Sequence, residues 1–583
     1  MKRIISLIGI LFFLSGNWSF AQTEESDITS TLTDSVLVIK GKGSMPEYSP
    51  WSSRPSISPW EKHPGIKKII IEEGITSIGD YTFRLLPNLV AVELPQNLTS
   101  IGNFAFEDCK EFTTINSLDD IEFFGNNAFA GCEKLQLPPI NFFYLTKIGF
   151  NAFKDCKGLQ SISLYSKNMY NIESYAFEGS DLAEVHLPDD APYFIRTGLF
   201  LGCKKLTSII IPEVVTGIEP STFENSGLTS IDIPGSVKWI SDRTFAGSDL
   251  ESIRFPANYE GTEIREETFI GTKLKNLAVP ERVITIYDRA FAECSELTSI
   301  TLPASLESIR PDAFRNCTKL TTIAIPAMYI SKAFSGSGLT SVEILSSVKH
   351  FSGETFEGCN HLITINVVED NQNFSSVEGV VFNKDKTTII CYPSGKTDSY
   401  YSIPSSVKTI EEQVFCGIDS LKVVVIPESV TAIQQEAFHI NRLKVETENP
   451  EPILVEVDAF GPKSVVSTCT LIVPDGTVQQ YKNAKVWRDF GSIIEKSEVS
   501  NELVYSDILP IVYPNPVKNE LNIEFSYSHI GHSCKIFGMN GALITEFVIS
   551  EPKTSIDVSR YPAGVYLVVT GNRNQTVKFV RMR

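Results

Sequence analysis

Apolar and polar residues alternate in short runs that end in proline, and the same run returns along most of the chain. It is clearest at 228–234 (LTSIDIP) and again at 297–303 (LTSITLP). Alternation with a period of two predicts a strand that buries one face. Proline closes each run because it has no N–H group to donate to a neighbouring strand.

Each run is followed by a second short apolar stretch and then by a phenylalanine, which returns about every 23 residues. The series comprises Phe83, Phe106, Phe129, Phe153, Phe177, Phe200, Phe223, Phe245, Phe269, Phe291, Phe314, Phe334, Phe356, Phe415 and Phe438. A fixed period of about 20 to 50 residues indicates stacked repeats, none of which buries its apolar face alone. We expect about 16 units, stacked about 4.8 Å apart with the phenylalanines inside.

The run L-x-S-I-x-I also predicts which side chains face the solvent. Its two isoleucine positions should face the core, and its third and fifth positions should face outward. The fifth position varies: Glu93, Asn116, Ser163, His186, Ile210, Asp232, Arg254, Thr301, Glu343 and Asn366. A variable column on a constant frame is typical of a recognition surface, but a solvent face without selection gives the same pattern.

A second candidate surface is aromatic. The early units depart from the consensus in their middles, with Phe142, Phe143, Tyr144, Tyr165, Tyr170, Tyr193, Phe194 and Tyr259. On neighbouring loops such rings would stack on sugars or anchor a protein partner. The alternative is that these loops fold their rings onto the core.

The repeats resemble the BspA-like leucine-rich repeats of bacterial surface proteins over about residues 30–495. The resemblance implies a mainly β, leucine-rich-repeat solenoid with an N-terminal cap at 22–65, repeats at 66–438 and a C-terminal cap at 439–497. A hairpin insertion at about 368–396 explains the long gap between Phe356 and Phe415. Within it, Val380–Phe382 should pair with Thr388–Cys391.

The N-terminus predicts a signal peptide at 1–21. Lys2 and Arg3 precede an apolar stretch, Ile4–Leu14, and small residues lie at the expected cleavage site between Ala21 and Gln22. The apolar stretch is too short to span a bilayer. Because no other stretch is longer and equally apolar, we expect no transmembrane segment in the mature chain.

The 23-residue repeat is absent from the C-terminal part of the sequence. After a linker at 498–510, short alternating runs with proline and glycine turns predict a small β-sandwich at 511–583. The segment resembles the C-terminal sorting domain of cargo of the type IX secretion system of Bacteroidetes. The matching residues are Tyr513, Pro514, Asn515, Pro516, Gly564, Val565, Tyr566 and Lys578. The resemblance implies export by that machinery to the cell surface or the medium; the alternative is an ordinary terminal β-domain. Gly538 departs from the pattern, where aspartate is frequent.

The net charge of the chain limits which classes of partner we expect. The net charge is −19 from 51 basic and 70 acidic residues, and loss of Lys2 and Arg3 leaves 49 − 70 = −21. This charge excludes nucleic acid and anionic membranes as favoured partners.

The slot three residues after the phenylalanine holds Cys109, Cys132, Cys156, Cys203, Cys294, Cys317 and Cys359. Serine fills it in other units, which predicts small, semi-buried thiols in an interior column rather than an obligatory disulfide framework.

No motif for catalysis is present. The chain lacks a nucleophile elbow, a phosphate-binding loop and a zinc-protease helix motif. His529, His532 and Cys534 look metal-like but have no second ligand cluster, so we expect neither metal nor cofactor. The sequence therefore predicts a non-enzymatic, exported, adhesin-like protein that binds an extracellular protein or glycan through its solenoid. A structural role at the cell surface is the alternative, and an active site assembled across units is a weaker one.

Overall fold

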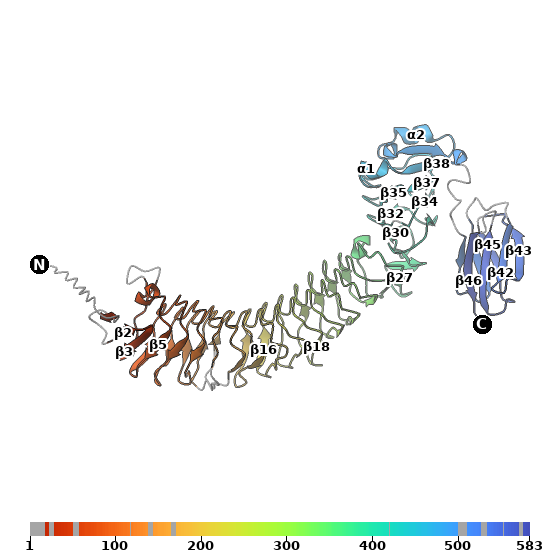
Figure 1. Cartoon of the computed structure of the whole chain (residues 1–583). Helices are drawn as coiled ribbons and strands as arrows, with labels where there is room; N and C mark the ends of the chain where they lie inside the picture. Colours follow the sequence, from red (N-terminus) through yellow and green to blue (C-terminus); the bar gives the residue numbers. More distant parts are fainter. Residues whose placement is uncertain are drawn as a thin grey trace. The chain divides into compact units, whose positions relative to one another are not determined.

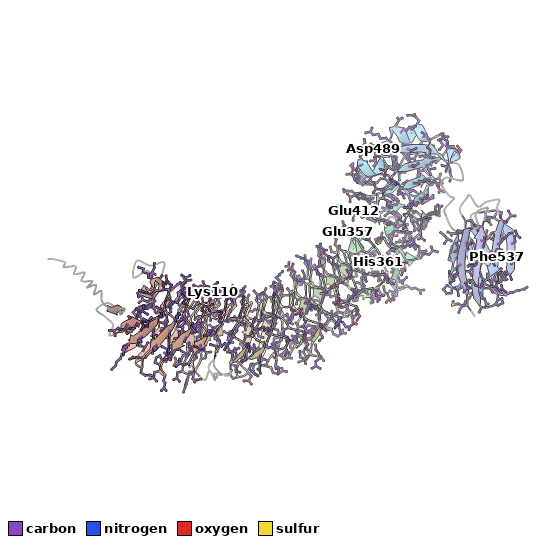
Figure 2. All side chains as sticks on the ribbon, viewed as in Figure 1. Lys110, Glu357, His361, Glu412, Asp489 and Phe537 are labelled. Carbon is purple, nitrogen blue, oxygen red and sulfur yellow. The ribbon has the colours of Figure 1, made fainter. Side chains whose placement is uncertain are left out.

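The computed structural model describes residues 18–21, 28–49, 57–116, 118–137, 144–164, 171–418, 420–499, 510–525, 533–551, 553–570 and 575–582. The chain forms two compact units, Met1–Asn373 and Phe374–Arg583. Stacked coils make up most of the first unit, and the second contains further coils and a separate sandwich (Figure 1). Exposed side chains such as Lys110 and Glu357 project from the coils of the first unit (Figure 2).

The predicted runs form the first ladder of parallel strands in the first unit. They are β5 (Lys68–Ile71), β7 (Ala91–Glu93), β9 (Thr114–Ile115), β12 (Ser161–Ser163), β14 (Glu184–His186), β17 (Ser230–Asp232), β18 (Ser252–Arg254), β20 (Asn276–Ala278), β22 (Ser299–Thr301), β24 (Thr322–Ile325), β26 (Ser341–Ile344) and β27 (Thr364–Val367). β17 and β18 pair in register, Ser230 with Ser252 and Asp232 with Arg254. Ile231 is buried and Asp232 exposed, so the predicted facing is confirmed.

The second apolar stretch of each unit forms a second parallel ladder. It comprises β4 (Gly43–Ser44), β6 (Ile75–Ile78), β8 (Ser100–Ile101), β10 (Phe123–Phe124), β11 (Lys147–Ile148), β13 (Asn171–Ile172), β15 (Tyr193–Ile195), β16 (Val215–Ile218), β19 (Glu263–Ile264), β21 (Thr285–Ile286), β23 (Ser308–Ile309) and β25 (Tyr329–Ile330). Both ladders are interrupted along the stack and divide into several sheets. A short 3-10 helix, η2 (Gly353–Phe356), forms near the end of the unit.

The phenylalanines stack inside the coils as predicted. From Phe83 to Phe356 successive ring centroids lie 5.1 to 5.9 Å apart with nearly parallel planes. Each ring between Phe83 and Phe356 contacts the rings of both neighbouring units, and the whole series is shielded from water. Burial and ring contact together make this column the main apolar link between successive coils.

The turn around most of these phenylalanines has two residues in the left-handed backbone region. Around Phe245 these are Arg243, with φ of 55°, and Gly247, with φ of 64°. A Cβ at Gly247 would lie 2.4 Å from Oδ1 of Asn225 in the preceding unit. Glycine is favoured there because it tolerates both the φ angle and the close approach.

The cysteines of the slot after the phenylalanine form an interior column, as predicted, but they are fully buried rather than semi-buried. The thiol of Cys109 donates to the carbonyl of Phe83 at 3.1 Å, and that of Cys317 to the carbonyl of Phe291 at 3.1 Å. Burial raises the pKa of Cys109 and that of Cys203 to about 12. These thiols therefore stay protonated and act as small apolar groups.

Buried thiols of this kind predict a loss of stability at alkaline pH. The pKa of Cys109 rises from an ordinary value of 9.0 to about 12 on folding, so the unfolded chain loses its proton first. The stabilisation is complete below pH 9 and falls above it, by about 1.4 kcal/mol per pH unit for each thiol. Guanidine unfolding of the native chain and of Cys109→Ser between pH 8 and 10 measures this. An equal pH dependence in both would contradict it, since serine does not ionise.

The N-terminal end of the first unit is covered by antiparallel strands. β2 (Thr29–Thr33) pairs with β3 (Val36–Lys40), and β3 continues in parallel onto β5. The 3-10 helix η1 (Pro59–Lys62) buries Trp60. β1 (Trp18–Ala21) pairs with β2 and ends at the predicted cleavage site, whereas Gln22 and residues 1–17 lie outside the described residues.

The second unit begins with the predicted hairpin insertion. β28 (Phe374–Val377) pairs antiparallel with β29 (Val380–Asn383), which pairs antiparallel with β30 (Thr388–Cys391). The predicted pairing of Val380–Phe382 with Thr388–Cys391 is thus confirmed. β30 then joins β32 (Thr409–Ile410) in parallel, so the insertion leads directly into the next ladder.

The remaining coils of the second unit repeat the same plan. Their strands are β31 (Tyr400–Ser402), β33 (Phe415–Cys416), β34 (Val423–Ile426), β35 (Ala432–Ile433), β36 (Phe438–His439), β37 (Lys444–Thr447), β38 (Thr470–Val473) and β39 (Ser492–Glu495). Phe415 and Phe438 stack at 4.9 Å, and Phe460, which the sequence pattern did not predict, adds a further ring at 5.3 Å.

The last coil is closed by short helices and aromatic side chains. These helices are α1 (Lys463–Val466), α2 (Val478–Asn483), η3 (Trp487–Asp489) and η4 (Lys496–Glu498). The indole of Trp487 packs on Phe460 at 5.0 Å and donates to the carbonyl of Ile453 at 2.9 Å. The hydroxyl of Tyr481 donates to the carbonyl of Asn449 at 2.9 Å. Both large side chains are buried with their polar atoms satisfied, as a cap over an open core requires.

The C-terminal strands form the predicted β-sandwich. One sheet contains β40 (Ile511–Tyr513), β41 (Glu520–Glu524) and β44 (Lys553–Asp557). The other contains β42 (Ser533–Gly538), β43 (Leu543–Val548), β45 (Gly564–Thr570) and β46 (Gln575–Arg581). Leu521, Ile536 and Val568 lie in its own buried core.

Candidate ligand-binding surface

The fifth-position side chains lie in one column on the first ladder. Eight of the ten fifth-position residues are exposed: Glu93, Asn116, Ile210, Asp232, Arg254, Thr301, Glu343 and Asn366. Ser163 and His186 are half-buried. Parallel pairing in register places equivalent positions of adjacent units side by side, as Ser163 and His186 show.

Many side chains of this column contact one another across units. Asp232 and Arg254 form an ion pair at 2.6 Å, and Oγ of Ser163 lies 3.2 Å from Nδ1 of His186. Asn116 uses its amide to bond the backbone of Leu94, at 2.7 Å and 2.9 Å. The exposed ion pair of Asp232 and Arg254 contributes little stability, so a ligand can exchange it for its own contacts at small cost.

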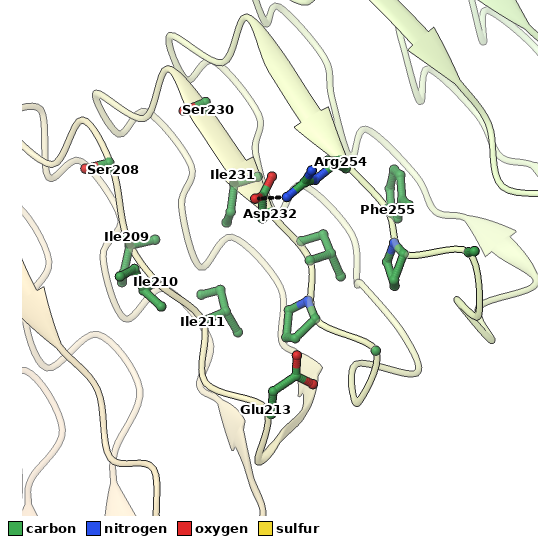
Figure 3. Close-up of a pocket in the computed structure, with 15 residues that line it drawn as sticks. Ser208, Ile209, Ile210, Ile211, Glu213, Ser230, Ile231, Asp232, Arg254 and Phe255 are labelled. Carbon is green, nitrogen blue, oxygen red and sulfur yellow. Dashed lines mark hydrogen bonds and ion pairs between the residues drawn. The ribbon is translucent and has the colours of Figure 1, made fainter.

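A hollow of about 700 Å³ opens on this face, where the coils around Ile210, Asp232 and Arg254 meet. The strand pattern is interrupted here, because Ser208–Ile210 form no strand within the described range 171–418. Ile210 is 85% exposed, although its position is polar in most other units. Figure 3 shows Ile210 and the Asp232–Arg254 ion pair at this hollow.

The aromatic residues predicted as a second surface do not share one environment. Tyr144 is 56% exposed, whereas Tyr259 is only 2% exposed. The hydroxyl of Tyr193 is buried and has no hydrogen-bond partner among the described residues. Phe142, Phe143, Tyr165 and Tyr170 lie outside the described residues. For Tyr259 the alternative of a ring folded onto the core is therefore the one observed.

An aromatic pair that the sequence did not reveal lies on the second ladder. Phe194 pairs with Gly217 in the adjacent strand, and the half-buried ring of Trp239 reaches over Gly217 to within 5.3 Å of the Phe194 ring centroid. A Cβ at Gly217 would lie 2.3 Å from the indole. The signal was Gly217 itself, which interrupts a strand between two aromatic positions.

The described residues offer no site for metal chemistry. No group of three or more histidine, cysteine, aspartate or glutamate side chains within them could hold a metal ion. Cys534 lies in the sandwich core, while His529 and His532 fall outside the described residues. No helix in the described part of the chain is long and apolar enough to cross a membrane.

The residues that resemble a sorting signal hold the sandwich together. The amide of Asn515 donates to the carbonyl of Lys578 at 3.0 Å and accepts from the N–H of Val580 at 2.9 Å. Tyr566 stacks on Phe579 at 5.3 Å. The other predicted residues lie at strand ends: Tyr513 closes β40, Pro514 and Pro516 follow it, and Gly564 and Val565 begin β45.

Two family models match the chain. One, described as a BspA type leucine rich repeat region, matches residues 60–168, 137–251, 170–297, 262–387 and 394–449, more than half of the 583 residues. The other, described as a secretion system C-terminal sorting domain, matches residues 511–581. No curated protein matches the chain.

Several solved structures are similar in fold. A leucine-rich repeat protein from Bacteroides ovatus has 20% identity, covers 72% of this chain and 95% of its own, and gives a TM-score of 0.41. The pneumococcal vaccine antigen PcpA has 20% identity, covers 53% of this chain and 89% of its own, and gives 0.32. A leucine rich cell surface protein from Faecalibacterium prausnitzii has 16% identity, covers 82% of this chain and 95% of its own, and gives a TM-score of 0.28.

Proposed function

This chain belongs to the BspA-type leucine-rich-repeat proteins, and from that membership we propose that it is an adhesin-like protein without enzymatic activity. It carries a type IX sorting domain, as secreted and cell-surface proteins do. The proposed ligand is an extracellular protein or glycan, bound along the fifth-position column of the first ladder.

The hollow around Ile210 carries this proposal. A side chain of isoleucine that is 85% exposed in a column of polar residues favours a contact site over a simple solvent face. Asp232 and Arg254 beside it offer both signs of charge to a partner. Apolar centre and polar rim are the usual arrangement of a protein interface.

Rigidity supports the same role. The stacked phenylalanines and in-register strands fix the column before a ligand arrives, which reduces the ordering cost of binding. Affinity would come from many small contacts along several coils, with the hollow as the strongest of them.

The test is binding of the purified full-length chain to an array of extracellular-matrix proteins and glycans. Ile210→Asp is expected to lower the affinity for the bound ligand about tenfold, because a charge replaces the apolar centre of the contact. Ile363→Asp is the matched control, since Ile363 is also exposed but lies in a distant unit. Both variants should keep the native unfolding temperature. Saturable binding of equal affinity in both variants would contradict the assignment of the hollow as the contact site. No binding at all would favour the structural role at the cell surface.

A further inference from the structure

A small pocket opens where the second ladder is interrupted. β13 ends one sheet and β15 begins the next, so the two strands are not paired with each other. The pocket between them has a volume of about 220 Å³ and includes Asn171, Tyr193 and Arg196 in its lining. Its size suits a single ring-shaped group rather than an extended segment of polypeptide.

The walls of this pocket present polar groups held in place by neighbouring coils. The guanidinium of Arg196 is fixed by Glu219 at 2.9 Å, and the amide of Asn171 donates to Glu173 at 2.8 Å. The buried hydroxyl of Tyr193 has no partner among the described residues. That hydroxyl is closed off from solvent, so the polar groups that a ligand in the pocket can reach are the amide of Asn171 and the guanidinium of Arg196.

The aromatic pair of Phe194 and Trp239 lies directly beside the pocket. Phe194 lines the pocket and is 42% exposed, so its ring belongs to both features. Trp239 reaches it only because Gly217 has no side chain between them. Two rings from coils two units apart, tilted by 51°, thus form an aromatic platform that meets the pocket at Phe194.

Nearby charges restrict the ligand further. Burial raises the pKa of Tyr193, and the carboxylates of Asp189 and Asp190 raise it further because their negative charges lie close to its hydroxyl. Arg196 is already neutralised by Glu219. An anionic ligand would meet net repulsion, whereas an uncharged one would not.

We propose that this pocket and the Phe194–Trp239 platform bind a neutral glycan. One sugar ring stacks through its C–H face on a ring of the platform, and its hydroxyls bond the remaining donors of Asn171 and Arg196. An apolar side chain would leave those donors without a partner in the pocket, so it fits less well. The inference rests on the proposed function in assigning a ligand class to the solenoid, but it uses a different ladder from the Ile210 hollow.

The test measures binding of neutral and sialylated oligosaccharides to the full-length chain, with tryptophan fluorescence as a second signal. Trp239→Ala is expected to lower the affinity for the neutral glycan by about tenfold or more. Gly217→Val should do the same while keeping the indole, because its side chain occupies the space under Trp239. Asn171→Ala removes an amide that lines the pocket and should cost about three- to tenfold.

Tyr329→Ala is the matched control, because Tyr329 is an exposed ring on the same ladder that stacks on His350 at 4.8 Å, far along the repeat from Trp239. This variant should bind the glycan normally. The proposal is overturned if no neutral glycan binds, if Trp239→Ala binds normally, or if Trp239→Ala instead loses a protein ligand. Array binding that depends on Ile210 but not on Trp239 would leave the proposed function intact and remove only this site.

Discussion

Replacing Phe153 with alanine is expected to lower the free energy of unfolding of the first unit by about 3 to 5 kcal/mol. The ring is fully buried and lies 5.4 Å from that of Phe129 and 5.7 Å from that of Phe177. Phe124 adds an edge contact at 5.2 Å. Truncation leaves a cavity that weakens the apolar contact of this coil with both of its neighbours.

Phe150 supplies the control within the same coil. Its ring is 41% exposed and makes one edge contact, with Tyr175 at 5.5 Å. Phe150→Ala should therefore cost less than about 1 kcal/mol, as substitutions at the surface usually do. Guanidine unfolding of the two variants, followed by circular dichroism, measures the difference. Equal losses would show that the stacked column is not the main source of stability.

The period of the phenylalanines was enough to predict most of the fold, because a repeat imposes its geometry on every unit. Strand facing, the ring stack and the thiol column all followed from position within the unit. Phe460 was missed because residues 439–497 were assigned to the C-terminal cap, although it follows Phe438 after 22 residues, has Ala459 before it and continues the column at 5.3 Å.

The candidate site was predicted less well because it depends on contacts between units. The variable column was visible in the sequence, but the ion pair of Asp232 with Arg254 depends on the register between two coils. Loop aromatics were ambiguous for the same reason, and Tyr259 proved to be buried. The Trp239 platform depends on an absent side chain at Gly217, a signal that composition cannot show.

Deleting residues 511–583 is expected to prevent the chain from reaching the cell surface while leaving the solenoid folded. The sandwich has its own core around Leu521 and Val568, separate from the core that ends at Trp487 and Phe490. Removing it therefore exposes no solenoid core. In a host with a type IX system, external protease should digest the full chain on intact cells but not the truncated chain, which should remain in the periplasm.

Two point variants separate the folded sandwich from its sequence motif. Val568→Asp places a charge in the sandwich core and should unfold it, although Tyr513–Pro516 and the other motif residues are unchanged. Met539→Asp alters an exposed side chain in the same domain and should be exported normally. If Val568→Asp reached the surface like the native chain, a linear motif would be recognised. If it failed as the truncation does, recognition would require the fold that Asn515 closes through its two bonds to β46.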